Sequence, residues 1–377
     1  MNFLLAITLA ATIKSINAPV VSPGPSGDFV FVVAGDNRPT AHGAPWPRVL
    51  PTIFSEIRLI QPAFVLWTGD TIYGYGDKDL AELQSEYAAF ASRAKHSAVP
   101  IVNAPGNHEV HDVQGMLPCA DQETEFKKHW GDLYGSFDYR GAHFIALDSE
   151  QCGHIGEIAG AQLDWLKQDL EANKAARAIF LFFHTETTLA PNDEDGKNHP
   201  PLKNSAVLQA LFEKYPVKAV FQGHEHLFYQ TTINGIQYFV AGGAGAPFYA
   251  PPEKGGFSHY LVVEMKGEQL TYKIVEPGHL YADEGKAAKA SEHLVWLVNS
   301  SDNLLPAQRI ETSVPASLGK CADLVAESRL TKYDGTPIPV PVAIESCKAS
   351  GSKHEITISA TAGAPRRSSV PIYVHKK

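Results

Sequence analysis

The sequence predicts a layered α/β domain followed by a small β-rich domain at the C-terminal end. Two features lead to this prediction. From Phe29 to Glu264, short apolar runs alternate with segments whose apolar residues recur at helical spacing, as in sheets covered by helices. After about Glu276 the helical pattern stops, and short apolar runs bounded by proline, glycine and serine indicate strands.

The composition excludes several classes of function. The 377 residues allow two or three domains and a large core, with 44% hydrophobic and 19% charged residues. The net charge of −9 and the lack of a basic stripe argue against a nucleic-acid partner. After the N-terminal region, no apolar segment is long enough to cross a membrane, so we expect no transmembrane anchor.

The N-terminal segment resembles a signal peptide. Residues Phe3 to Ile13 form an apolar run that is too short to span a bilayer, and small residues around Ala18 permit cleavage. We therefore expect residues 1–18 to be a signal peptide and the protein to be secreted or periplasmic. The alternative is that this run is a buried N-terminal strand.

The four cysteines are more consistent with disulfides than with a zinc site. None of them forms a Cys-x-x-Cys motif. In a secreted chain, proximity in sequence favours the pairs Cys119–Cys152 and Cys321–Cys347, although four cysteines permit three pairings.

The expected elements follow from apolar runs and helical spacing along the chain. Residues His279 to Ala290 are polar and indicate a linker, so we divide the chain into a signal peptide (1–18), an α/β domain (19–278), a linker (279–304) and a β-rich domain (305–377). Strands are expected at 29–33, 63–67, 99–102, 143–147, 178–183, 217–221, 237–241, 261–264, 337–342, 354–358 and 370–374, and helices at 49–60, 80–94, 163–170 and 207–212. Residues 111–139 indicate a loop with a short helical piece, and Ala322 to Leu330 is the single later segment with a helical pattern.

Polar side chains that can bind metal ions follow several of the expected strands. Because the carboxyl ends of parallel strands meet at one edge of a sheet, these side chains should lie together. Carboxylate, amide and imidazole groups suit divalent or trivalent first-row metals, and their number fits two metals bridged by one carboxylate. A single histidine at a strand end is more often an ordinary hydrogen-bonded residue, but the repeated pattern favours a metal site. The candidate ligands are Asp36, Asp70, Asn107, His184, His224 and His226.

The motifs that contain these residues resemble those of the calcineurin-like metallophosphoesterases. Gly-Asp occurs at 35–36 and 69–70, Gly-Asn-His-Glu at 106–109, a histidine closes a strand at 184, and Gly-His-Glu-His occurs at 223–226. The resemblance covers roughly Phe29 to Glu276 and implies a layered β-sandwich flanked by helices. It also implies that His108 lies beside the substrate phosphate, where it stabilises charge or protonates the leaving oxygen. One metal would be held by Asp36, Asp70 and His226, and the other by Asp70, Asn107, His184 and His224.

Two residues bear on the subfamily. Arg38 stands where many members have a histidine ligand, and its guanidinium could bind phosphate; the alternative is a surface ion pair or a brace for the loop. Tyr73 lies three residues after Asp70, where the similar purple acid phosphatases have a tyrosinate ligand; the alternative is a tyrosine packed on the loop. The resemblance to that branch is partial, because the extra β-rich region is C-terminal here. It implies iron paired with zinc, manganese or a second iron.

Other residues near these motifs have smaller expected roles. The Gly242–Pro247 segment is no P-loop, because no Lys-Ser/Thr follows, and we expect a structural turn. The histidines at 111, 154, 199 and 259 could line the pocket, but we favour solvated loop residues for each, and Asp148 could orient His108.

The expected function is that of a dinuclear metal-dependent phosphoester hydrolase, an acid-phosphatase-like phosphomonoesterase acting on a small-molecule or lipid phosphoester. One alternative is a phosphodiesterase acting on nucleotides or lipid head groups. Another is an inactive metallophosphoesterase scaffold used for binding, with the β-rich domain as the contact module. The complete ligand set argues against the inactive scaffold.

Overall fold

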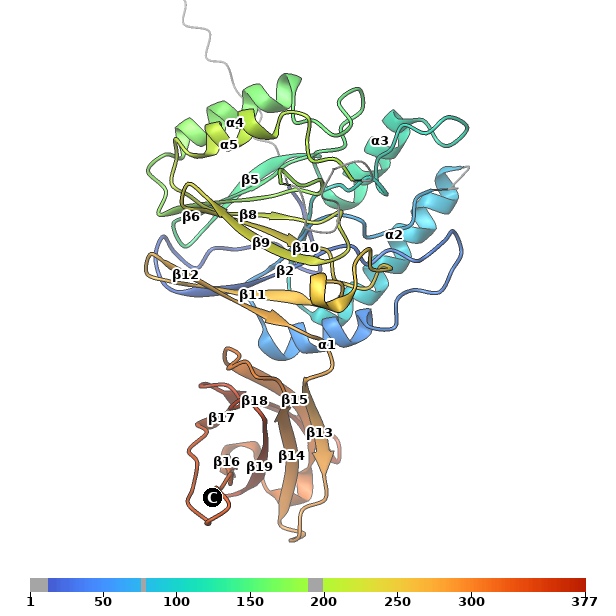
Figure 1. Ribbon diagram of the computed structural model, residues 1–377. Coiled ribbons are helices and arrows are strands. Elements are labelled where there is room, and N and C mark those ends of the chain that lie inside the picture. The colour runs from blue at the N-terminus through green and yellow to red at the C-terminus, as the bar shows by residue number, and fades with distance from the viewer. Residues whose placement is uncertain (1–12, 76–78, 189–198) are drawn as a thin grey trace, which may run out of the picture. The chain divides into compact units, whose positions relative to one another are not determined.

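The computed structural model describes residues 13–75, 79–188 and 199–377 (Figure 1). The chain forms two compact units. The first comprises Met1–Leu50, Ala63–Lys95 and Pro100–Tyr272, and the second comprises Pro51–Pro62, His96–Val99 and Lys273–Lys377. Among the described residues, none of the helices has the length and apolar character needed to span a bilayer.

The first unit contains two six-stranded sheets, apart from the end of β12, which from Lys273 on is assigned to the second unit. The first sheet has the order β1-β4-β3-β2-β11-β12, in which β2, β3 and β4 are parallel. The second has the order β5-β6-β7-β8-β10-β9, in which β6, β7, β8 and β10 are parallel. The strands of the first sheet are β1 (Ser15–Ile16), β2 (Phe29–Ala34), β3 (Val65–Trp67), β4 (Ile101–Asn103), β11 (Tyr260–Lys266) and β12 (Gln269–Val275). Those of the second are β5 (Gly135–Tyr139), β6 (Ala142–Ala146), β7 (Ala178–Phe182), β8 (Val217–Gln222), β9 (Phe228–Ile233) and β10 (Ile236–Ala241).

Aromatic side chains fill the space between the two sheets. Phe31 of β2 is fully buried and lies with its ring centroid 5.5 Å from that of Phe144 on β6 and 5.6 Å from that of Phe180 on β7. Tilted and edge-on aromatic contacts of this kind are favourable in addition to the burial of their area. The layered β-sandwich predicted from the sequence is therefore confirmed.

Helices cover the outer side of the second sheet. In Figure 1, α4 (Gly160–Ala172) and α5 (Ser205–Phe212) lie over this sheet. Leu166 and Leu170 of α4 and Leu208 and Phe212 of α5 belong to one buried apolar cluster with residues of β6, β7 and β8. Their recurrence at helical spacing is the reason why the sequence predicts these helices.

Two further helices are linked to the first sheet by aromatic contacts. These are α2 (Leu80–Ala94), which begins after the capping carboxylate of Asp79, and α3 (Cys119–Trp130). The ring of Phe90 on α2 lies 5.4 Å from that of Trp67 on β3 and 5.9 Å from that of Trp130 on α3.

The second unit is rich in β-structure, as the sequence predicts for the C-terminal region. A four-stranded sheet has the order β13-β14-β19-β16, and a three-stranded sheet has the order β15-β18-β17. Helix α1 also belongs to this unit, where the carboxylate of Glu56 accepts hydrogen bonds from the backbone N–H groups of Gly278, His279 and Leu280. The elements are α1 (Leu50–Ile60), β13 (Leu280–Gly285), β14 (Glu292–Asn299), β15 (Gln308–Pro315), β16 (Leu324–Ser328), β17 (Val342–Ser350), β18 (Lys353–Ala360) and β19 (Ser368–Lys376). Short 3₁₀ turns occur at Lys95–Ser97, Pro252–Lys254, Ala316–Leu318 and Cys321–Asp323.

Three expectations for local structure are wrong. The predicted linker 279–304 contains β13 and β14, and all of β13 pairs with Leu294–Asn299 of β14. Polar residues of the segment lie on β13, an edge strand, where charged side chains face solvent. The helical pattern at 322–330 is overridden by pairing of β16 with β19. The strand expected at 337–342 begins only at Val342, because the prolines before it cannot donate to a ladder.

Two expectations for the covalent structure have different outcomes. The disulfides Cys119–Cys152 and Cys321–Cys347 are present, which confirms the favoured pairing. Most of the predicted signal peptide lies outside the described residues. Its end includes β1, which pairs with β4 at the edge of the first sheet, so cleavage after Ala18 would remove a two-residue edge strand and leave the other strands in place.

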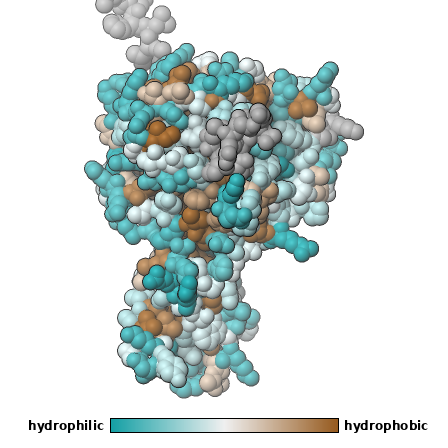
Figure 2. All heavy atoms as spheres, viewed as in Figure 1, coloured by the Kyte–Doolittle hydropathy of each residue, from teal (hydrophilic) through white to brown (hydrophobic). Residues whose placement is uncertain are grey.

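The face of the molecule drawn in Figure 2 is mostly hydrophilic, with brown residues in separate patches. This distribution is ordinary for a folded protein, in which scattered apolar residues remain at the surface.

Candidate metal centre

The two aspartates that follow β2 and β3 lie on adjoining turns. Asp36 and Asp70 both have left-handed backbone conformations, with φ of 60° and 55°. The N–H of Asp36 donates to Gly69 O at 3.1 Å, and the N–H of Asn37 donates to Asp70 O at 3.2 Å. His224, after β8, also has a positive φ of 70°. Non-glycine residues in this region are strained, and such strain concentrates at functional sites.

Glycines allow these turns to approach one another. A Cβ atom placed on Gly223 would lie 2.4 Å from Oδ2 of Asp36, and one on Gly106 would lie 2.4 Å from Oδ1 of Asp70. Only glycine permits these close approaches, which explains the glycine that precedes His224 and the one that precedes Asn107.

Four potential ligand atoms converge at one point beside Asp70. Nε2 of His184 lies 2.8 Å from Oδ1 of Asn107 and 3.3 Å from Oδ1 of Asp70. Nδ1 of His224 lies 3.0 Å from the same Asn107 oxygen and 3.1 Å from Nε2 of His184. Groups from the first sheet and from the second sheet therefore meet at a single cluster of nitrogen and oxygen atoms.

The hydrogen bonds around this cluster leave lone pairs facing one another. Nδ1 of His184 lies 2.8 Å from Thr68 O and must donate, since a carbonyl only accepts; Nε2 of the neutral ring therefore carries a lone pair. Nδ2 of Asn107 donates to Tyr75 at 2.8 Å, which directs its carbonyl oxygen to the histidines. Two acceptors 2.8 Å apart repel each other unless a cation lies between them, so these donors fit a metal ion.

A second group of ligand atoms surrounds Asp36. Nδ1 of His226 is 2.5 Å from Pro247 O and donates to it, so its Nε2 is bare and lies 3.6 Å from Oδ1 of Asp36. Oδ2 of Asp36 is buried and accepts no hydrogen bond within the described part of the chain. Ligand atoms of Asp36, Asp70 and His184 lie within 4.8 Å of one another, which joins this group to the cluster at Asn107.

Burial sets the protonation of these groups. It raises the pKa of Asp36 well above its usual range, with the Asp70 charge adding to the effect, and it raises the pKa of Asp70 to about 7. Burial also lowers the pKa of His184, and it lowers the pKa of His226 to about 3. The imidazoles are therefore held in the neutral form that binds metals, and the carboxylates need nearby positive charge to ionise easily.

A pocket of about 360 Å³ opens beside the cluster. Arg38 and His108 lie in its wall. The side chain of Arg38 is 11% exposed, with Nε 3.5 Å from Oδ2 of Asp70, and its Nη2 donates to the hydroxyl of Tyr249 at 3.2 Å. The lining residues are Arg38, Thr40, Asp70, Tyr73, Tyr75, Asn107, His108, His199, His224 and Tyr249.

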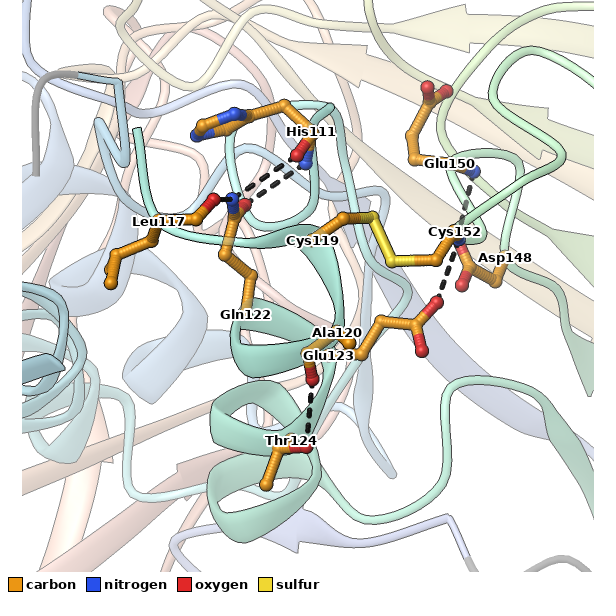
Figure 3. Close-up of a disulfide and its surroundings, with 10 residues drawn as sticks. All are labelled: His111, Leu117, Cys119, Ala120, Gln122, Glu123, Thr124, Asp148, Glu150 and Cys152. Atoms are coloured by element: carbon orange, nitrogen blue, oxygen red, sulfur yellow. Dashed lines mark hydrogen bonds between the residues drawn. A yellow bond between two sulfur atoms is a disulfide. The ribbon is translucent and has the colours of Figure 1, made fainter. Parts of the chain in front are cut away.

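His108 is oriented by the backbone of Tyr73. Its Nδ1 donates to Tyr73 O, which leaves Nε2 on the side of Asp70, 3.9 Å from Oδ2. Burial, together with the charge of Arg38, lowers the pKa of His108 well below its usual value. Asp148, the residue expected to orient His108, instead accepts from the N–H of Glu150, so that expectation is wrong (Figure 3).

The structure places Tyr73 in the pocket wall. Its ring centroid lies 6.0 Å from the guanidinium carbon of Arg38, and its N–H donates to Glu86 at 2.9 Å. Its backbone therefore supports His108 while its ring borders Arg38. The assignment of Tyr73 as a metal ligand stays a prediction.

Sequence reasoning missed one buried residue that supports the site and misjudged another. Glu109 is fully buried and accepts from the N–H groups of Asp70, Thr71 and Gly106, which fixes the turn that carries Asp70. Its place at the end of the Gly-Asn-His-Glu motif is the one signal that could have revealed it. His199, for which the solvated loop was favoured over the pocket wall, lines the pocket, and His111 and His259, expected to be solvated, are buried.

A disulfide holds the segment that follows the Gly-Asn-His-Glu motif. Cys119 at the start of α3 is bonded to Cys152, and the carboxylate of Glu123 accepts from the N–H of Cys152 (Figure 3). The side chain of Gln122 bonds both the N–H and the carbonyl of His111. The segment 111–139, expected to be a loop with a short helical piece, thus contains the twelve-residue helix α3. The disulfide of Cys119 and the hydrogen bonds of Gln122 hold the start of this helix.

Comparison with known proteins places the chain among phosphoesterases. A family model described as calcineurin-like phosphoesterase matches residues 29–228. A human protein named serine/threonine-protein phosphatase CPPED1 is 29% identical over 222 residues, which is 56% of this chain and 67% of that protein. A probable cyclic nucleotide phosphodiesterase of Fibrobacter succinogenes is 31% identical over 151 residues, which is 39% of this chain and 55% of that protein. A solved structure titled GAP50, the anchor in the inner membrane complex of Plasmodium, has 14% identity and a TM-score of 0.49, and the match covers 72% of this chain and 89% of that one.

Proposed function

This chain belongs to the calcineurin-like phosphoesterase family and is a phosphoric ester hydrolase, and from this premise we propose that it is a two-metal phosphomonoesterase. The observation that carries the proposal is the cluster of lone pairs at Asp70, Asn107 and His184, next to the guanidinium of Arg38. A cation-binding centre beside a fixed positive side chain suits a substrate with several anionic oxygens.

We assign the two metal sites to overlapping sets of residues. We propose that Asp70 serves both, and two contacts support this: its Oδ1 lies 3.3 Å from Nε2 of His184, and its turn adjoins the turn that carries Asp36. A bound pair of cations would lower the pKa of a water molecule and neutralise phosphoryl oxygens. The first set is Asp36, Asp70 and His226, and the second is Asp70, Asn107, His184 and His224.

His108 is proposed to act on the leaving oxygen. Tyr73 O holds its Nδ1, so Nε2 is available on the side of Asp70 and the pocket. A bound phosphate dianion would oppose the effects of burial and of Arg38 on the pKa of His108, and would favour the protonated ring. A proton on Nε2 could then be transferred to the departing alkoxide.

Arg38 supports the preference for monoesters. Its side chain is held by Asp70 and Tyr249 in the pocket wall. A monoester presents two charges and more free oxygens than a diester, so a fixed guanidinium binds it better. The competing proposal is a phosphodiesterase, which the names of two bacterial relatives favour.

The proposal is tested by turnover of p-nitrophenyl phosphate and its bis-ester, each with and without a chelator, together with elemental analysis of the purified protein. We expect two metal ions per chain, faster turnover of the monoester, and loss of activity after chelation. Faster turnover of the bis-ester would instead establish the phosphodiesterase, and no turnover of either would favour a binding scaffold.

The metal identity and the compartment are also proposals. Tyr73 as a tyrosinate ligand would give an iron-loaded protein a visible absorption band, so a colourless oxidised iron protein would exclude this role and the purple acid phosphatase branch. The two disulfides favour an oxidising compartment and thereby support secretion.

A further inference from the structure

Tyr249 lies at the pocket although no motif marks it. It follows the Gly242–Pro247 turn, whose backbone is tied to the first sheet: the N–H of Ala244 donates to Gly35 O at 3.0 Å, and that of Ala246 donates to Asp36 O at 2.9 Å. The turn thus fixes Tyr249 relative to the loop that carries Asp36 and Arg38.

The ring of Tyr249 is held by two imidazoles. It lies nearly parallel to His226, with centroids 4.1 Å apart and planes at 16°, and to His199, with centroids 4.6 Å apart and planes at 13°. Nδ1 of His199 lies 3.3 Å from a carboxylate oxygen of Glu225. These contacts fix the plane of the phenol, although 40% of the residue is exposed.

The hydroxyl of Tyr249 has a defined hydrogen-bonding direction. It accepts from Nη2 of Arg38 at 3.2 Å. A phenol has one proton to donate, and a hydroxyl that accepts from a guanidinium directs its own proton elsewhere. The residue lines the same pocket as Asp70, Asn107 and His108, so an anion bound there is a suitable acceptor.

We propose that the Tyr249 hydroxyl is a substrate-binding group that donates a hydrogen bond to a non-bridging oxygen of the phosphate, beside Arg38. The two groups together recognise a terminal phosphate, and this selects monoesters over diesters. This inference rests on the proposed phosphomonoesterase function, which it extends by a specificity-determining residue.

The test replaces Tyr249 by phenylalanine, which keeps the stacked ring and removes the hydroxyl. Binding of inorganic phosphate to the metal-loaded protein is measured by calorimetry, and kinetics are measured on p-nitrophenyl phosphate and its bis-ester. We expect about tenfold weaker phosphate binding, a similar rise in KM for the monoester, little change on the bis-ester, and unchanged metal content. The matched control is Tyr333→Phe, at a fully exposed tyrosine, which should leave every value unchanged.

A double variant separates direct donation from a role through Arg38. If the hydroxyl donates to phosphate, Tyr249→Phe weakens phosphate binding further in an Arg38→Ala background. Unchanged phosphate affinity in the single variant, or no added loss in that background, overturns the proposal. If the wild-type protein prefers the bis-ester, the phosphomonoesterase proposal and the monoester selectivity are rejected, whereas calorimetry of phosphate binding still tests hydrogen-bond donation by Tyr249.

Discussion

At the scale of single residues, Asp70 is the most demanding test of the metal centre. As the proposed bridge, it should be needed for both ions, so Asp70→Ala should lose both, as measured by elemental analysis after dialysis. The matched control Asp164→Ala removes a carboxylate that is 72% exposed and should retain both. Two ions still bound to Asp70→Ala would reject the bridging role.

Arg38 tests the substrate class. Removing its charge-assisted contacts with phosphate in Arg38→Ala should cost about 1.5–3 kcal/mol of transition-state stabilisation, which is roughly one to two decades in kcat/KM for a monoester. The bis-ester should be nearly unaffected, and the metal content should not change. Arg58→Ala, at a half-exposed arginine in the second unit, serves as the control. Equal losses on both esters would show that Arg38 braces the loop.

The residues that sequence reasoning could identify are those that follow an apolar run. Asp36, Asp70 and His184 could be identified because each follows a continuous apolar run that forms a strand. The positions of Tyr249 and His199 in the pocket could not be inferred from an apolar run. Their loops have no periodicity, and only the folded chain brings them to the pocket. Glu109 was overlooked because its role consists of hydrogen bonds to backbone groups of distant turns.

At the scale of elements, His143 links β5, β6 and α4 through two carboxylates. Its Nδ1 lies 2.7 Å from Asp138 Oδ1 and its Nε2 lies 2.8 Å from Asp169 Oδ2, so both contacts are strongest when the ring is protonated on both nitrogens. Burial lowers the pKa of His143, but the hydrogen bonds with Asp169 and Asp138 outweigh it, and the net pKa is raised. Because the folded pKa is the higher one, this stabilisation is complete below the unfolded pKa of about 6.5 and is lost as the pH rises through the folded pKa.

The pH dependence of His143→Gln tests this link. The variant should lose about 1.5–3 kcal/mol of unfolding free energy at about pH 5.5, and less at about pH 9, by urea denaturation. The control is His96→Gln, which replaces a histidine that is not part of the contacts between His143, Asp138 and Asp169. A loss of the same size at both pH values would mean that His143 contributes by packing alone.

Elements with a long regular pattern could be predicted, and elements defined by their partners could not. The helix at 80–94 has the predicted bounds because its apolar face and its capping Asp79 are local. Strands β13 and β16 carry polar or mixed residues and exist because β14 and β19 pair with them.

At the scale of the whole molecule, each unit contains one disulfide. Cys119–Cys152 closes a separation of 33 residues in the first unit, and Cys321–Cys347 closes one of 26 in the second. Replacing Cys119 and Cys152 together by serine should lower the unfolding free energy of the first unit by about 2–4 kcal/mol. Urea denaturation followed by tryptophan fluorescence measures this, with the Cys321/Cys347 double variant for comparison. An unchanged midpoint would show that Glu123 and Gln122 alone hold the segment.

The carboxylate of Glu56 has a consequence for the modularity of this chain. The second unit is discontinuous in sequence, since Pro51–Pro62 clusters with Lys273–Lys377, and one glutamate satisfies three backbone donors at the start of β13. A truncation after Tyr272 would therefore remove these three backbone donors from the buried carboxylate of Glu56, which should destabilise α1. Expression of the phosphoesterase part alone would therefore have to retain the start of β13, because the helix that carries Glu56 lies between β2 and β3 in the sequence.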